Sequence, residues 1–189
     1  KHIDTGAGFE RIVALSQGVE SNYETDLFAP ILARIGELTG EQDPLAEQSV
    51  AYRVIADHAR AITFLIGDGV LPGNEGRNYV LRMILRRAVR FGRTLGLNEP
   101  FLARVAEAVI EAMGGHYTEV AARRQFIVTT ITQEEQRFLR TLDMGLARLD
   151  EVLAEIDSQG GRVVPGEAAF RLYDTFGLPL EISRDVAVE

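Results

Sequence analysis

The sequence predicts an all-α fold: a bundle of helices with one long helix, preceded by a short strand and turn. Three observations indicate this. Apolar residues recur at three- and four-residue steps over most of the 189 residues, which is the spacing of one helix face. Glycine and proline gather where this spacing lapses, as expected at helix ends. Only the first residues, up to Gly8, have the character of a strand that runs into a turn.

The first half of the chain predicts five helices. Glycine is expected at the ends of several of them, because it adopts the left-handed conformation that closes a helix, and proline suits the first turn of another. A segment with four glycines and one proline, 67–76, separates the third helix from the fourth. The expected helices are 10–17, a second with Thr25 as its N-cap that ends at Gly40, about 47–66, about 78–95, and one from Glu99–Pro100 to Gly114–Gly115.

A long apolar stripe dominates the second half. Between Thr118 and Ile156 there is no proline and a single glycine, Gly145, so we expect one long helix or two in tandem. A short helix over 167–175 and a last helix after Pro179 follow. The stripe comprises Phe138, Leu142, Leu146, Leu149, Val152, Leu153 and Ile156.

Composition restricts the class of protein. The chain is 46% hydrophobic and 25% charged, with a mean hydropathy near zero, which is ordinary for a cytoplasmic globular protein. No apolar run reaches the roughly 18 residues of a membrane span. Cysteine is absent, and the three histidines lack the spacing of a metal site, so no metal is expected. Lys1 opens the chain without an apolar signal region, and we interpret both ends as cuts within a longer protein.

One segment of this acidic chain is strongly basic. The net charge of −8 repels phosphates at long range, so any nucleic-acid site must be local. On an ideal helix Arg82, Arg86, Arg90 and Arg93 fall within about an 80° arc, which favours phosphate binding. The alternative is a face paired with carboxylates of the long segment, for which Glu134, Glu135 and Asp143 are candidates. The sequence leaves both open. The arginines between residues 76 and 98 are Arg77, Arg82, Arg86, Arg87, Arg90 and Arg93.

Three shorter features are suited to ligand contacts. Gly6 and Gly8 permit close approach to a ligand, and Arg11 follows with a guanidinium that fits a phosphate. Asn74 lies in the glycine-rich loop and carries both a donor and an acceptor. Asp174 can accept from a base amino group, and it stands at a helix end where the dipole disfavours a carboxylate. The structural alternatives are a tight turn, a turn or cap residue, and a helix-end residue.

Five segments, taken together and in order, resemble the alanyl-tRNA synthetase family. They cover nearly the whole chain, so the set is far more specific than any one of them. The loop departs from the commoner family form, because it reads GNEGRNYV with Asn78 where that form ends in GYV. The segments are 4–11 (DTGAGFER), which resembles motif 3 of class II synthetases, 22–28 (NYETDLF), 52–58 (YRVIADH), 78–82 (NYVLR) and 172–177 (LYDTFG).

The resemblance implies a role for each part of the chain. Residues 1–20 would end the class II catalytic domain, with Gly8 near the adenosine and Arg11 on the γ-phosphate of ATP. Residues 21–189 would be a helical domain that binds the acceptor stem of tRNA(Ala). Asn74 and Asp174 would read its G·U wobble pair from the two grooves. The six arginines of residues 76–98 would contact backbone phosphates, which position the RNA without specifying its sequence.

The resemblance also implies what the chain lacks. The full-length enzyme would be an alanine–tRNA ligase that uses ATP and Mg²⁺. Motifs 1 and 2 and the zinc-binding editing domain lie outside these residues, so we expect neither bound cofactor nor zinc here and no aminoacylation by this stretch alone. The expected partners are the tRNA acceptor stem and the rest of the synthetase chain, with no membrane.

Two other functions are compatible with parts of the sequence. The chain could be a helical protein–protein interaction module whose partner surface is the stripe 138–156. Packing of that stripe within the same chain would argue against it. It could also be a nucleotide-binding regulatory protein that uses the turn at 6–11, which would require a complete phosphate site within the chain.

Overall fold

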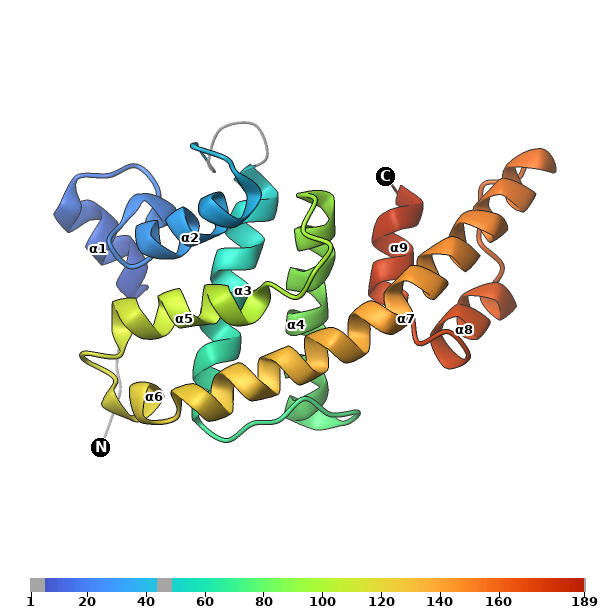
Figure 1. The fold of residues 1–189 in the computed structure, drawn as a ribbon. Helices are drawn as coiled ribbons and strands as arrows, with labels where there is room; N and C mark the ends of the chain where they lie inside the picture. The colour runs from blue at the N-terminus through green and yellow to red at the C-terminus, as the bar shows by residue number, and fades with distance from the viewer. Residues whose placement is uncertain (1–5, 44–48, 189) are drawn as a thin grey trace. The chain divides into compact units, whose positions relative to one another are not determined.

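A computed structural model describes residues 6–43 and 49–188. Within these ranges all regular structure is helical (Figure 1), which confirms the all-α prediction. The strand expected before Gly6 lies outside the described residues. None of the described helices is long and apolar enough to cross a bilayer. The helices are α1 (Phe9–Gln17), the 3-10 turn η1 (Asn22–Glu24), α2 (Ala29–Thr39), α3 (Ser49–Gly67), α4 (Gly76–Thr94), α5 (Leu102–Met113), α6 (Thr118–Ala122), α7 (Arg124–Ser158), α8 (Gly166–Asp174) and α9 (Leu180–Val188).

The chain divides into two compact units, Lys1–Thr132 and Gln133–Glu189, which we call unit 1 and unit 2. The first contains α1 to α6 and the start of α7, and the second contains the rest of α7 with α8 and α9. The domain boundary expected after residue 20 stays a prediction. In the structure α1 belongs to unit 1 and contacts η1.

Unit 1 is built around α3, which contacts α2, α4, α5 and α6. Figure 1 shows α5 crossing α3 and α4 standing beside it. Ile55, Ile62 and Ile66 of α3 are fully buried, and each such side chain contributes about 1.5–3 kcal/mol by burial. Ala56 and Ala59 are also fully buried, and their small side chains leave room for neighbouring helices. The helix expected over about 47–66 is therefore present, as α3, and it lies at the centre of unit 1.

The turn between α4 and α5 is packed around one aromatic ring. Phe101 precedes α5 and is only 3% exposed. A Cβ added at Gly92, near the end of α4, would overlap this ring. The glycine therefore provides the space into which the phenyl ring packs.

Unit 2 is a small helical assembly formed by the second part of α7 with α8 and α9. Its buried side chains include Leu149, Leu172 and Ile182. Gly145 lies against Leu178, because a Cβ there would come within 3.0 Å of the Leu178 Cβ. The chain reverses between α8 and α9 at Gly177, whose φ is +63°.

The structure corrects the expected start of the second helix and decides whether residues 118–156 form one helix or two. The prediction that Thr25 caps the second helix is wrong, because its hydroxyl donates to the Asn22 carbonyl at 2.6 Å and α2 begins only at Ala29. Pro30 then lies in the first turn of α2, where its missing N–H costs nothing. Of the two possibilities for 118–156, the tandem pair is correct: the helices α6 and α7 are interrupted at Arg123, whose guanidinium donates to the Gly67 carbonyl at 2.5 Å.

We expect Gly92→Ala to destabilise unit 1 by about 1–3 kcal/mol, because the new methyl group overlaps a buried ring that cannot move aside. This reverses the usual helix preference, which favours alanine over glycine by about 1 kcal/mol. Urea unfolding of both proteins measures the difference. The control is Gly115→Ala, since a Cβ at Gly115 meets nothing within 4 Å. Equal free energies of unfolding for Gly92→Ala and the wild type would contradict this packing.

Candidate nucleic-acid interface

The loop that joins α3 to α4 is tied back to both helices. The Val70 N–H donates to the Leu65 carbonyl at 2.9 Å, which closes the end of α3. The Gly73 N–H donates to the Asn78 carbonyl at 3.0 Å. A Cβ at Gly73 would lie 2.8 Å from the Cβ of Asn78, which is closer than real contacts allow. The loop therefore folds against the first turn of α4 because residue 73 has no side chain.

Asn74 is exposed next to this contact, and its side chain does not cap α4. Its Oδ1 accepts a hydrogen bond from Nη1 of Arg82, two turns into α4. Of the two structural alternatives, the cap is therefore excluded, and Asn74 remains a surface residue whose amide is held by an arginine.

The arginines of α4 differ in their access to solvent. Arg77 and Arg87 are exposed, and the Arg87 guanidinium lies 5.8 Å from the centre of the Phe91 ring. Arg82, Arg86 and Arg93 are half-buried, and Arg90 is only 5% exposed. The latter four all take part in interactions within the protein. The side of α4 that carries these four arginines is therefore less accessible than the side that carries Arg77 and Arg87.

Asp174 is the last residue of α8, in unit 2, and is exposed. The turn behind it is formed by backbone hydrogen bonds from the Thr175 N–H to the Arg171 carbonyl and from the Leu178 N–H to the Leu172 carbonyl, both at 3.0 Å. The helix dipole disfavours a carboxylate at this end. Burial of Leu172 with an exposed Asp174 fixes which face of α8 is presented to solvent.

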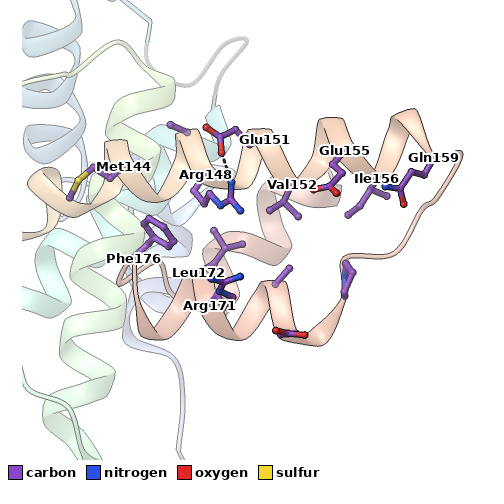
Figure 2. Close-up of a pocket in the computed structure, with 14 residues that line it drawn as sticks. Met144, Arg148, Glu151, Val152, Glu155, Ile156, Gln159, Arg171, Leu172 and Phe176 are labelled. Atoms are coloured by element: carbon purple, nitrogen blue, oxygen red, sulfur yellow. Dashed lines mark hydrogen bonds and ion pairs between the residues drawn. The ribbon is translucent and has the colours of Figure 1, made fainter.

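A cavity of about 740 Å³ lies beside α8 in unit 2 (Figure 2). Arg148 and Arg171 line it together with Glu151, Glu155 and Glu167, and Arg148 pairs with Glu151. Acidic and basic groups are thus mixed around it. Such a lining does not favour a polyanionic ligand, so the cavity gives no support to a nucleotide site in this unit.

The glycine turn at the start of α1 leaves its arginine in solvent. Gly8 is the N-cap of α1, and Arg11 is exposed in the first turn. A Cβ at Gly8 would touch only the Arg11 side chain, at 3.6 Å. In contrast to Gly73 and Gly92, Gly8 is thus not required by packing within the described residues.

The neighbouring residue, Glu10, ties α1 to the centre of unit 1. Its Oε1 accepts from Nη2 of Arg60 on α3 at 2.6 Å. The Arg60 guanidinium also lies 4.3 Å from the centre of the buried Phe28 ring. The sequence gives no signal of this anchor, because residues 10 and 60 lie far apart in the chain and belong to no common helical pattern.

Comparison with known proteins identifies the family. The family model described as tRNA synthetases class II (A) matches residues 1–189. The chain belongs to this family. The resemblance stated from five segments is thereby confirmed.

Several similar proteins are named alanine–tRNA ligase. The chain is 50% identical to that protein from Geobacillus thermodenitrificans, over 100% of the chain and 22% of the relative. It is 51% identical to the Roseiflexus castenholzii protein over 99% of the chain and 21% of the relative. It is 52% identical to the Thermotoga maritima protein over 100% of the chain and 21% of the relative. The chain thus spans about a fifth of the length of these synthetases.

We expect Glu10→Gln to reduce the free energy of unfolding at neutral pH by at most about 1 kcal/mol, because the pair with Arg60 is only part-buried. A hydrogen bond accepted from its own backbone, and then the one accepted from Arg60, lower the pKa of Glu10 from the ordinary value of a glutamate. Because the folded-state pKa is lowered, the contribution of the carboxylate is present above the unfolded-state pKa and is lost as pH falls through the lowered pKa.

Urea unfolding between pH 7 and pH 3 measures this effect. The wild type and Glu10→Gln should differ at pH 7 and converge at the acidic end. Glu99→Gln, at an exposed position of unit 1, is the control and should show no such convergence. A difference between wild type and Glu10→Gln that is the same at every pH would exclude the ionised pair as its cause.

Proposed function

We propose that this chain is the part of an alanine–tRNA ligase that binds the acceptor stem of tRNA(Ala) and reads its G·U wobble pair. Asn74 and Asp174 are the base-reading residues in this proposal. The main support is the exposed amide of Asn74, which is held in one orientation at the start of an arginine-rich helix. A fixed polar group beside positive charge suits a base pair flanked by phosphates.

Backbone contacts follow from the exposure of the arginines. Arg77 and Arg87 are accessible and would bind phosphates directly. Arg82, Arg86 and Arg93 are half-buried, so they would reach a phosphate only with the outer part of the guanidinium. Arg90 is 5% exposed, and its part in the interface would be to maintain the helix that carries the others.

The turn at Gly8 and Arg11 would serve the ATP site of the full-length enzyme. Arg11 is exposed beside the anchored Glu10, so its guanidinium could reach a γ-phosphate. The described residues contain no group of three or more acidic or histidine side chains that could hold a metal ion. No Mg²⁺ ligand is therefore assigned within the part of the chain that the structure describes.

The two alternatives receive less support. Phe138, Leu142 and Leu149 of the long stripe are fully buried within the chain, so they offer no surface to an outside partner. This weighs against a protein–protein interaction module based on that stripe. For a nucleotide-binding regulatory protein, the described residues offer only one exposed arginine at the glycine turn, and the cavity beside α8 is of mixed charge.

We expect Asn74→Ala and Asp174→Ala each to reduce the preference of the chain for an acceptor-stem RNA hairpin with a G·U pair over one with a G·C pair. The loss should be about tenfold each, since one good contact to a base is worth about 1–3 kcal/mol. Fluorescence anisotropy with the two hairpins measures both dissociation constants. Should wild type and both variants bind the two hairpins with the same ratio, base reading by these residues would be excluded.

We expect Arg87→Ala to weaken binding of both hairpins alike, because a phosphate contact carries no sequence information. The slope of log affinity against log salt concentration should become shallower by about one. Titrations at several salt concentrations measure this slope. Arg104→Ala is the control, since Arg104 is exposed on α5, outside the basic helix, and should leave the slope unchanged. An effect of Arg87→Ala confined to the G·U hairpin would contradict its assignment to the backbone.

A further inference from the structure

The contact between Arg82 and Asn74 settles which way the exposed amide faces. A guanidinium has five N–H donors and no acceptor. The end of the amide that faces Nη1 of Arg82 must therefore be Oδ1. The two ends of an asparagine amide are otherwise hard to tell apart, and here the chemistry of the partner decides.

This orientation leaves Asn74 with a defined set of free groups. Across the planar amide, the NH₂ group lies on the side away from Oδ1 and carries two donors. One lone pair of Oδ1 is occupied by a cationic donor, and hydrogen bonds of this kind are stronger than neutral ones. Because the side chain is exposed, the NH₂ group is the part of Asn74 that most readily meets a ligand.

The backbone on both sides of Asn74 is held in place. Gly73 is bonded to Asn78 at 3.0 Å and has no room for a side chain. On the other side, α4 begins at Gly76, whose φ is +55°. The loop is thus fixed at both ends, and the remaining freedom of Asn74 lies in its side chain, which Arg82 holds.

We propose that Arg82 is the positioning residue for base reading: it holds Oδ1 of Asn74, so that the amide NH₂ is presented as a donor to an acceptor atom of the wobble pair. This inference rests on the proposed function. It also divides the work between the two base-reading residues. A carboxylate only accepts hydrogen bonds, so Asp174 takes an amino group, while Asn74 takes a ring nitrogen or a carbonyl oxygen of a base.

The test measures the ratio of G·U to G·C hairpin affinity for the whole 189-residue chain. Arg82→Met keeps the length of the side chain and removes its donors. We expect it to lower the ratio about tenfold, as Asn74→Ala does. Because Arg82 acts through Asn74, the double variant should show no further loss. The positioning role would be overturned if Arg82→Met kept the wild-type affinity ratio while Asn74→Ala lowered it.

Asn74→Asp tests the donor itself. The carboxylate keeps an acceptor for Arg82 but has no N–H, so the ratio should fall as in Asn74→Ala. A wild-type ratio for Asn74→Asp would mean that Asn74 is read through its oxygen and would overturn the donor assignment. Arg77→Met is the matched arginine control: it should weaken both hairpins and leave the ratio unchanged. If Arg77→Met lowered the ratio as much as Arg82→Met does, the effect of Arg82 would come from its charge alone, and the proposal would be overturned.

A second measurement needs no RNA and therefore separates the inference from the proposed function. The side-chain NH₂ signal of Asn74, assigned by its absence in Asn74→Ala, gives an NMR order parameter. It should be high in the wild type and fall in Arg82→Met, while the melting temperature reports whether the fold is intact. Equal order parameters in the wild type and Arg82→Met would show that Arg82 does not restrict the Asn74 side chain, and the proposal would be overturned. A high order parameter together with no G·U preference in the wild type would overturn the proposed function, and with it the role in base reading.

Discussion

The burial of α3 is the constraint on which the rest of unit 1 depends. A helix that contacts four others needs apolar or small residues around most of its circumference, and Ile55, Ala59 and Ile62 meet this need. Its polar positions are then few and are used for specific contacts. Arg60 binds Glu10, and the chain beyond the last turn of α3 leads directly into the loop of Asn74. Both the turn at Arg11 and the Asn74 amide are thus positioned from one buried helix.

The sequence was sufficient to predict where the longer helices lie, but it did not predict where some of them begin or end. Apolar spacing reports the face of a helix over several turns, so every helix of nine or more residues was expected near its place. Helix ends depend on single hydrogen bonds. Thr25 has the right residue type for a cap, yet its hydroxyl bonds backward to Asn22. The break at Arg123 coincides with no glycine or proline, and Arg123 instead bonds to Gly67, distant in sequence.

The residues proposed for the candidate site were chosen from the sequence, whereas their contacts could not be predicted from it. The sequence drew attention to Asn74 and Asp174 because of the turns in which they stand, and both are exposed. Angles around a helix axis group Arg82, Arg86, Arg90 and Arg93, but they do not reveal what covers that side, and Arg90 is buried. The pairing of Arg82 with Asn74 requires the loop to fold back on α4, and that of Glu10 with Arg60 requires the tertiary fold. Neither follows from local spacing.

The close approach of residues 73 and 78 means that the two positions share the space of a single side chain. With asparagine at 78, only glycine fits at 73, since a second Cβ would lie 2.8 Å away. Glycine at 78 would relieve this crowding, whereas a side chain at 73 has room only when the one at 78 is absent. The loop that carries Asn74 therefore accommodates one side chain at this pair of positions and not two.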